Sequence, residues 1–250
     1  MNNSQSILNK FTSKKGQVAI LIDPEKCDNG PKLLELIKKA EFAAINYFFI
    51  GGSTVTKTEF DLTINFLKLN TGIPLVIFPG SSHQVSEKAD ALLYLSLLSG
   101  RNPDYLIGHH VQSASEIYKL DFEVISTGYI LVDGGTRSTV SYISQTTPIP
   151  SDQISIVRNT AIAGVLQGKK MLYFDAGSGA KYPISAEIIK EVVSFGVPII
   201  VGGGIRTLEK MEELKKGGVN VIVIGNHIEE NIDFLLDIKS FTCGNFDYDK

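Results

Sequence analysis

Cysteine, long apolar runs and clusters of basic residues are all scarce in this chain of 250 residues. Its two cysteines, Cys27 and Cys243, lack a CxxC or Cys/His neighbour, which disfavours a thiolate metal site or redox site and is typical of a reducing cytoplasm. The apolar run 91–98 is too short to span a membrane, and the polar residues 1–16 lack the apolar core of a signal peptide. The 24 basic residues are dispersed among 27 acidic ones, which disfavours nucleic acid as a partner. We therefore expect a cytoplasmic protein.

Two common motifs are also missing. No GxGxxG follows the first strand-like run, where the turn reads LIDPEKCDNG (21–30), so an open dinucleotide-binding sheet is disfavoured. There is no HExxH, and the adjacent His109 and His110 have no recognised zinc spacing. We therefore expect no structural zinc.

What the chain does contain is a regular alternation of strand-like and helical patterns. Eight runs rich in β-branched and aromatic residues are predicted strands, at 18–23, 47–52, 74–80, 91–97, 123–133, 171–177, 198–204 and 221–226. Amphipathic patterns predict helices at 31–44, 57–69, 153–166, 185–195, 207–216 and 228–238. Apolar strands alternating with helices predict an α/β fold, and eight of them favour one (β/α)8 TIM-barrel domain over 1–250. The spacing between the third and fifth strands is short, so we expect one or two helices to be replaced by loops.

Glycine-rich turns follow the last three predicted strands. They read YFDAGSGA (173–180), VGGGIRT (201–207) and VIGN (223–226). In a TIM barrel the loops after strands seven and eight commonly bind phosphate, and glycine lets backbone N–H groups approach phosphate oxygens closely. The chain therefore predicts a ligand that carries phosphate.

Several polar residues end the predicted strands. Asp23 fits a magnesium ligand or a general base at the catalytic mouth, and equally an N-cap or Asx turn before Pro24. Ser53 fits a ligand of the same ion or the cap of the next helix. Tyr173 and Asp175 are two residues apart and share one face of their strand. Asp175 could orient or deprotonate a bound hydroxyl, or could be a core-facing acid bonded by loop N–H groups.

Two further loops contain residues of interest. Arg101 and Asn102, after the fourth strand, are good anion-binding types and are predicted to bind diphosphate. His83 is a lone loop histidine, for which a surface position is the commoner outcome and a place in the site the alternative.

The ordered set of motifs is highly specific. LIDPEK, FIGGST, FPGS, YLSLLSGRNPDYLIGHH, YFDAGSGA, VGGGIRT and VIGN together resemble geranylgeranylglyceryl phosphate synthases and their heptaprenyl relatives, from about Ala19 to the last helix. The resemblance implies a modified (β/α)8 barrel that uses Mg²⁺ and transfers an all-trans polyprenyl group from its diphosphate to the 3-hydroxyl of sn-glycerol 1-phosphate, in ether-lipid synthesis. It also implies a homo-oligomer, and the lipid substrate leaves peripheral membrane contact open.

The same resemblance assigns roles by position. Asp23 and Ser53 would hold the magnesium ion, with Tyr173 and Asp175 as the catalytic pair. Family members often carry Glu in place of Asp175, and the shorter side chain favours orientation of the glycerol hydroxyl over direct proton abstraction. Aromatic residues such as Tyr94, Tyr129 and Tyr142 could line a groove for the prenyl chain, although barrel core is their default. The glycerol 1-phosphate site would consist of Tyr173, Phe174, Asp175, Ala176, Gly177, Ser178, Gly179, Gly203, Gly204, Gly225 and Asn226.

Two other functions share part of this pattern. A phosphosugar isomerase or epimerase would use the same barrel and glycine turns, but has little use for a diphosphate-bound magnesium ion or a long apolar groove. A non-catalytic phosphate-binding barrel would not need ionisable groups such as Asp23 and Asp175 at one mouth.

Overall fold

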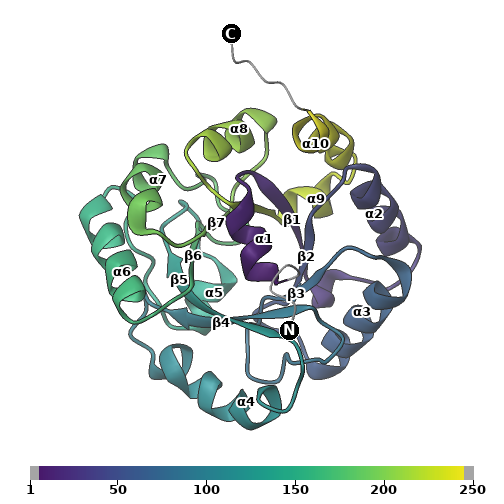
Figure 1. Ribbon diagram of the computed structural model, residues 1–250, viewed down its shortest axis with the longest axis horizontal. Helices are drawn as coiled ribbons and strands as arrows, with labels where there is room; N and C mark the ends of the chain where they lie inside the picture. The colour runs from purple at the N-terminus through teal and green to yellow at the C-terminus, as the bar shows by residue number, and fades with distance from the viewer. Residues whose placement is uncertain (1–5, 245–250) are drawn as a thin grey trace.

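A closed ring of eight parallel strands, in the order β1 to β8, forms the centre of the molecule (Figure 1). The computed structural model describes residues 6–244. The ring closes where β8 pairs with β1, with Val223 opposite Ala19. The predicted TIM barrel is therefore confirmed. The strands are β1 (Gln17–Ile22), β2 (Tyr47–Ile50), β3 (Leu75–Ile77), β4 (Ala91–Leu97), β5 (Glu123–Leu131), β6 (Met171–Asp175), β7 (Ile199–Gly202) and β8 (Val221–Ile224).

Helices surround this ring, and one of them covers its N-terminal end. They are α1 (Ile7–Ser13), α2 (Pro31–Phe42), α3 (Lys57–Asn70), α4 (His109–Ile117), α5 (Thr139–Ile143), α6 (Ile154–Leu166), α7 (Ala186–Val192), α8 (Leu208–Lys216), α9 (Asn226–Glu230) and α10 (Phe234–Cys243). Two 3₁₀ turns, η1 (Pro24–Lys26) and η3 (Val193–Phe195), and a π-helical turn, η2 (Asp104–Gly108), complete them. The connection from β3 to β4 contains no helix, as the short spacing predicted, whereas η2 and α4 fill the connection from β4 to β5.

The prediction of one helix over 228–238 is wrong, because the chain breaks between α9 and α10. The Asn231 side chain accepts a hydrogen bond from the Asp233 amide at 3.2 Å, and this local turn competes with helical hydrogen bonding. A 3.6-residue apolar period continues across the break, so periodicity alone could not reveal it.

Alternation along the strands separates two apolar layers. Side chains such as Phe49, Leu93 and Val221 fill the barrel interior, whereas Phe48, Leu92 and Ile222 pack outward against the helices. Interior side chains leave no open channel, so ligands must bind at an end of the barrel.

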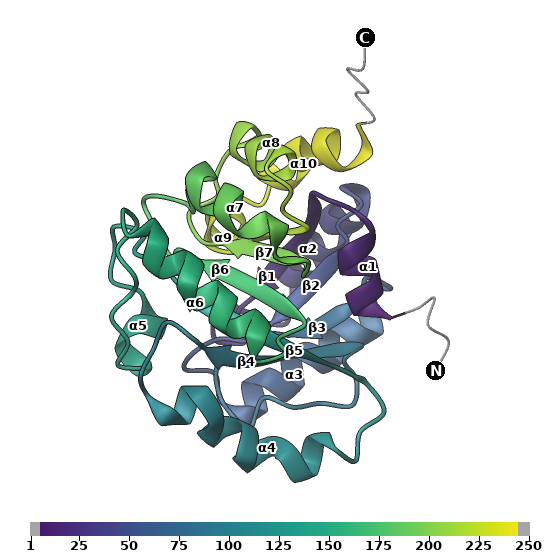
Figure 2. The same ribbon diagram turned by 60° about the vertical axis from the view of Figure 1, so that its left-hand side comes forward.

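Helix α1 closes the N-terminal end of the barrel (Figure 2). Phe11 is fully buried, and its ring lies 4.8 Å from that of Tyr47 inside the barrel. The Glu123 carboxylate accepts hydrogen bonds from the Ile7 amide at 2.5 Å and the Ser6 hydroxyl at 2.6 Å, which caps the helix. The opposite end, where the strand C-termini lie, is left for function.

No helix between residues 6 and 244 is long and apolar enough to cross a bilayer. The longest of them, α3, has 14 residues.

Candidate active site

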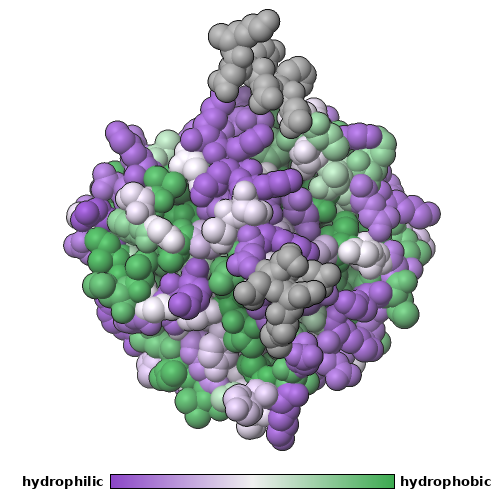
Figure 3. Space-filling model, viewed as in Figure 1, coloured by the Kyte–Doolittle hydropathy of each residue, from purple (hydrophilic) through white to green (hydrophobic). Residues whose placement is uncertain are grey.

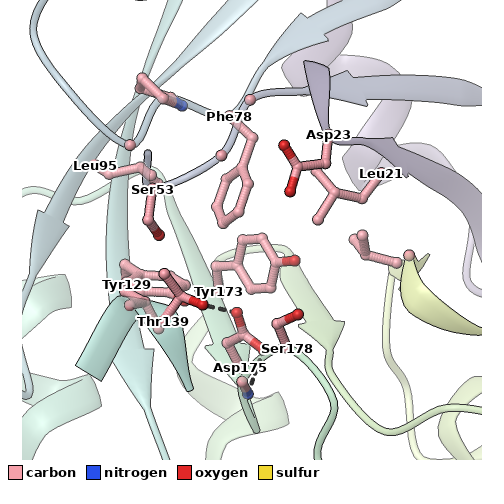
Figure 4. A pocket seen from close by; sticks show the side chains of 18 of the residues that line it. Leu21, Asp23, Ser53, Phe78, Leu95, Tyr129, Thr139, Tyr173, Asp175 and Ser178 are labelled. Atoms are coloured by element: carbon pink, nitrogen blue, oxygen red, sulfur yellow. Dashed lines mark hydrogen bonds between the residues drawn. The ribbon is translucent and has the colours of Figure 1, made fainter. Parts of the chain in front are cut away.

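A cavity of about 250 Å³ opens among the C-terminal ends of the strands. One part is polar and lies among the loops that follow β1, β6, β7 and β8. The other part, which we call the apolar arm, lies between β4, α4 and α5 and is lined by Leu92, Leu95, Tyr105, Ile117, Val140 and Ile143. Figure 4 shows the polar part, with Asp175 below the rings of Tyr129, Tyr173 and Phe78.

Asp175 is the buried carboxylate at the base of this cavity. The Tyr129 hydroxyl donates to its Oδ2 at 2.6 Å, and the Gly177 amide donates to its Oδ1 at 2.7 Å. Burial raises the pKa of Asp175 above its usual range, and the two hydrogen bonds oppose that rise. Each oxygen keeps a second lone pair, so the carboxylate can still accept a hydrogen bond from a ligand hydroxyl.

Three aromatic rings line the cavity above Asp175. The Tyr129 and Tyr173 ring centroids are 5.4 Å apart with perpendicular planes, and the Phe78 ring lies 5.0 Å from that of Tyr173. Burial and the nearby Asp175 charge raise the pKa of both tyrosines well above the usual value, so both stay neutral hydroxyls. Among residues 6–244, the Tyr173 hydroxyl has no hydrogen-bond partner and is available to a ligand.

The glycine turns form a cradle of backbone amides beside Asp175. Within the described chain, the amides of Ser178, Gly179, Gly203 and Gly204 donate to no protein acceptor. Gly203 has φ +85°, and a Cβ there would lie 2.7 Å from Asp175 Oδ1 and 2.8 Å from the Gly177 nitrogen. The Ser178 hydroxyl donates to Asn226 Oδ1 at 2.9 Å and joins the turns after β6 and β8. Free amides converging on one cavity are the features that bind a phosphate group.

Asp23 lies on the opposite wall of the cavity. Its Oδ1 accepts from the Glu25 amide at 3.2 Å, and its Oδ2 lies 3.8 Å from Lys26 Nζ. Burial raises the pKa of Asp23, and Lys26 partly offsets this effect. The capping interpretation is thus correct in part, but the carboxylate also lines the cavity.

The residues around Asp23 fit a magnesium ion that takes part of its ligands from the substrate. No three His, Cys, Asp or Glu side chains in the range 6–244 converge as a protein-only metal site would require. Mg²⁺, however, commonly uses one or two carboxylates together with substrate phosphates and water. Asp23 suits that mode, whereas Figure 4 shows the Ser53 hydroxyl on the other side of the Phe78 ring from the Asp23 carboxylate.

The loops after β2 and β3 are locked together by Gln84. This fully buried side chain donates to the Gly52 carbonyl at 2.8 Å and accepts from the Gly80 amide at 3.0 Å. A Cβ at Gly51 or Gly80 would collide with the backbone of the other loop. This close packing fixes Phe78 and Ser53, which lie in these loops, at the cavity wall.

Two histidines contribute to the wall of the apolar arm. The His110 ring stacks on Tyr94 with 4.0 Å between centroids, and its Nε2 donates to the Leu95 carbonyl at 2.7 Å. Burial lowers the pKa of His110, which keeps the ring neutral and suited to an apolar neighbour. The Tyr105 ring contacts the second histidine, His109, edge-on at 4.9 Å.

The family is decided by comparison with known proteins, because the PcrB family model matches residues 10–242. This chain belongs to the PcrB family. The PcrB-family chain is 48% identical to geranylgeranylglyceryl phosphate synthase of Chitinophaga pinensis over 93% of this chain and 94% of that protein. It is 36% identical to the synthase of Korarchaeum cryptofilum, over 89% and 91% of the two chains.

Solved structures agree with this assignment. The (S)-3-O-geranylgeranylglyceryl phosphate synthase of Thermoplasma acidophilum, in complex with its substrate sn-glycerol-1-phosphate, aligns with a TM-score of 0.87 at 31% identity, covering 94% of this chain and 96% of that one. The tryptophan synthase α-subunit of Pyrococcus furiosus aligns with a TM-score of 0.54 at 11% identity, over 91% and 97%, and shares the fold alone.

Most predicted site residues of this PcrB-family protein meet at the cavity. Its wall includes Asp23, Ser53, Tyr173, Asp175, Gly177, Ser178, Gly179, Gly203, Gly204, Gly225 and Asn226. Phe174 and Ala176 do not line it, which corrects the prediction for their side chains. Alternation along the chain turns both outward into the layer between strands and helices.

Arg101 and Asn102 also lie outside the cavity wall. Arg101 Nη1 donates to the Gly100 carbonyl at 2.7 Å, and Asn102 Nδ2 donates to the Ser144 carbonyl at 3.0 Å. Both side chains therefore stabilise the loop between β4 and η2. The prediction that they bind diphosphate rested on residue type alone and is not supported by these contacts. The His83 Nε2 atom donates a hydrogen bond to the Val55 carbonyl, and Tyr142 is 83% exposed. Neither residue lines the cavity.

Sequence reasoning missed three contributors. Tyr129 was expected only as groove or core, yet it bonds Asp175, and Phe78 and Gln84 were not singled out. Nothing local distinguishes these side chains, because each acquires its role from a partner on another strand or on the loop that follows another strand.

Proposed function

We propose that this PcrB-family protein joins an all-trans polyprenyl diphosphate, geranylgeranyl or similar, to the 3-hydroxyl of sn-glycerol 1-phosphate, forming an ether bond and releasing diphosphate. One observation carries the proposal: a single cavity combines free amides of the glycine turns, a buried carboxylate beside them and an apolar arm. A small phosphate, a hydroxyl and a hydrocarbon chain would each find its complement there.

The cradle supports glycerol 1-phosphate as the acceptor. The free amides of Ser178, Gly179, Gly203 and Gly204 suit its phosphate, and the Tyr173 hydroxyl suits a glycerol oxygen. Asp175 lies next to this cradle, so the glycerol hydroxyl can donate to the carboxylate while the phosphate is held. The structural relative from T. acidophilum was solved with this same compound.

The reaction then follows from the placement of the groups. The glycerol 3-oxygen attacks the first carbon of the prenyl group, and the C–O bond to the diphosphate breaks with its electron pair staying on the diphosphate. The hydroxyl proton is released to solvent. Asp175 orients that hydroxyl and accepts its hydrogen bond, which lowers the cost of losing the proton. Positioning of the two substrates can contribute ~7–11 kcal/mol when alignment is good.

The diphosphate requires a cation. We propose that Asp23 holds a magnesium ion, which would supply charge neutralisation for the leaving diphosphate. The Ser53 hydroxyl lies on the other side of the Phe78 ring and would not share that ion. Asp23 lies across the cavity from Asp175. Asp23 would therefore serve the prenyl diphosphate, and Asp175 the glycerol 1-phosphate. A cytoplasmic location and a homo-oligomeric state are further expectations, and sedimentation velocity would test the latter.

A direct assay tests the proposed activity. Purified protein is incubated with Mg²⁺, sn-glycerol 1-phosphate and labelled prenyl diphosphates of several lengths, and the ether product is identified by mass spectrometry. We expect product with sn-glycerol 1-phosphate and much less with its sn-3 enantiomer or in the presence of EDTA. Absence of product with every prenyl donor would refute the proposal, and turnover of a sugar phosphate would favour the isomerase alternative.

A substitution at Gly203 tests the amide cradle. In Gly203→Ala the methyl group would lie within 3 Å of Asp175 and two backbone nitrogens, at a φ that disfavours side chains. We expect KM for glycerol 1-phosphate to rise roughly tenfold or more, consistent with loss of at least one phosphate contact, while KM for the prenyl diphosphate changes little.

The matched control is Gly196→Ala. Gly196 has φ +78°, but a methyl group there would meet nothing within 4 Å, so this variant carries the backbone strain without the collision. Equal rises in both KM values for Gly203→Ala, or the same change in the control, would place the phosphate elsewhere.

A further inference from the structure

The cavity wall carries little positive charge for a site that would bind two phosphorylated substrates. Of the Lys and Arg residues between 6 and 244, two line the cavity, Lys26 and Arg206. Arg206 comes soon after the cradle glycines in the chain, on the side proposed for glycerol 1-phosphate. Lys26 follows Asp23 in η1, on the wall proposed for the diphosphate. Because Arg101 lies outside the cavity wall, the diphosphate has no basic side chain among the partners described so far.

Lys26 is held at the cavity wall by Glu229 of α9. Its Nζ atom donates to Glu229 Oε2 at 2.9 Å and lies 3.8 Å from Asp23 Oδ2. The side chains of Lys26 and Glu229 are 44% and 31% exposed, so a ligand can reach the pair. Burial alone would lower the pKa of Lys26, but the hydrogen bond and charge of Glu229 outweigh burial and raise it. The ammonium therefore stays charged at neutral pH.

The ammonium group of Lys26 has hydrogen-bond donors to spare. A lysine carries three N–H donors, and within the described chain Glu229 is the one acceptor that Lys26 reaches. The 3.8 Å separation from Asp23 is too long for a hydrogen bond. Lys39 shows the contrasting case of a structural lysine, because its ammonium donates to two carboxylates at 2.6 Å each. The remaining donors of Lys26 are therefore available to a ligand.

We propose that Lys26 binds the diphosphate of the prenyl donor through its free N–H donors, and that Glu229 positions it there. The inference rests on the proposed function, because it adds a ligand for the proposed leaving group. When the C–O bond breaks, its electron pair stays on the diphosphate, which gains negative charge. An ammonium fixed beside the diphosphate stabilises that added charge and lowers the barrier to bond breaking.

A plain surface ion pair is the alternative role of Lys26 and Glu229. Such pairs contribute little to stability and do not need a place at a cavity. Here Asp23, Glu25 and Glu229 all line the cavity, and the charges of the two glutamates act on Asp23. A wall with three carboxylates and no ammonium would repel a diphosphate. Lys26 offsets this repulsion, which favours the role of a substrate ligand.

Calorimetry with inorganic diphosphate tests the proposal without turnover. The full chain and Lys26→Gln are titrated with diphosphate at a fixed, saturating Mg²⁺ concentration. We expect Kd for diphosphate to rise roughly tenfold or more in Lys26→Gln, which is about 1.4 kcal/mol, because glutamine removes the charge. The Kd for sn-glycerol 1-phosphate should be unchanged. Lys26→Arg keeps the charge and should restore part of the affinity for diphosphate.

Lys210→Gln is the matched control. Figure 3 shows a hydrophilic surface over α8, and Lys210 of this helix pairs with Glu213 at 2.8 Å outside the cavity wall. The control removes one positive charge and one lysine–glutamate pair, as Lys26→Gln does. It should bind diphosphate like the unmodified protein. Melting followed by circular dichroism checks that both variants are folded, and Lys26→Met replaces Lys26→Gln if the latter does not fold.

Kinetics separate a ligand of the diphosphate from structural support. In Lys26→Gln, kcat should fall roughly tenfold or more, while KM for glycerol 1-phosphate stays unchanged. Glu229→Gln leaves Lys26 charged but less well positioned, so its effect on diphosphate affinity should be smaller. The double variant should bind diphosphate about as weakly as Lys26→Gln alone, because Glu229 acts through Lys26.

Each remaining outcome is decisive. Failure of the unmodified protein to bind diphosphate, equal affinity in Lys26→Gln, or an equal loss in Lys210→Gln would overturn the assignment. A rise confined to KM for glycerol 1-phosphate would place Lys26 at the cradle, which also overturns it. Absence of ether product with every prenyl donor would refute the proposed function, while calorimetry would still decide whether Lys26 binds diphosphate.

Discussion

Replacing Asp175 with alanine is expected to lower kcat by roughly 10²–10⁴-fold, the usual range for a group that assists proton transfer. The carboxylate is held by Tyr129 and Gly177, and its remaining lone pairs face the cavity that holds the amide cradle. Alanine would leave the Tyr129 hydroxyl and the Gly177 amide without their acceptor and the glycerol hydroxyl without its partner. Steady-state kinetics with both substrates, at saturating Mg²⁺, measures the effect.

Conservative replacements separate the roles of Asp175. We expect Asp175→Glu to retain substantial activity, since family members often carry that residue. Asp175→Asn keeps the size and removes the charge, so a base loses far more rate than an orienting group does. The half-saturating Mg²⁺ concentration should be unchanged in all three variants. An active Asp175→Ala enzyme would contradict the assignment.

The same carboxylate should set the acid side of the pH profile. Asp175 must be ionised to act, and burial raises its pKa, so activity should be lost as pH falls through a value above the usual carboxyl range. The Tyr129 hydrogen bond favours the ionised form. Tyr129→Phe should therefore move the acid limb of kcat/KM further upward.

Replacing Asp23 with asparagine is expected to cut activity at limiting Mg²⁺ by at least ~100-fold, because metal stabilisation of a leaving anion is worth several kcal/mol. Asp23 is a carboxylate on the cavity wall opposite the cradle, and asparagine offers Mg²⁺ a neutral and weaker ligand. Activity measured against Mg²⁺ concentration should show a large rise in the half-saturating concentration.

Asp28→Asn is the matched control for Asp23. Asp28 lies in the same loop, but its carboxylate is exposed and accepts from the Gly30 amide. Both variants should melt like the unmodified protein in circular dichroism. Normal magnesium dependence in Asp23→Asn would show that the ion is held elsewhere.

The strand periodicity and glycine turns were enough to predict the barrel and the place of the phosphate cradle. Buried parallel strands read as continuous apolar runs, and Gly177, Gly179, Gly203 and Gly204 mark positions with positive φ. Both are local signals that follow from backbone geometry. The alternation of Tyr173 and Asp175 likewise placed both side chains on the inner face of β6.

The tertiary structure decided which side chains complete the site. Arg101 and Asn102 have the chemistry of diphosphate ligands, but the nearest acceptors are loop carbonyls, which take their hydrogen bonds. Tyr129 lies 46 residues from Asp175 in sequence and meets it only because β5 and β6 are neighbours in the barrel. The sequence by itself thus determined the fold and the backbone that binds phosphate, because these depend on local conformation. The partners of Asp175, the outward turn of Phe174 and the pairing of Lys26 with Glu229 depend on contacts between distant segments, and folding alone brings those together.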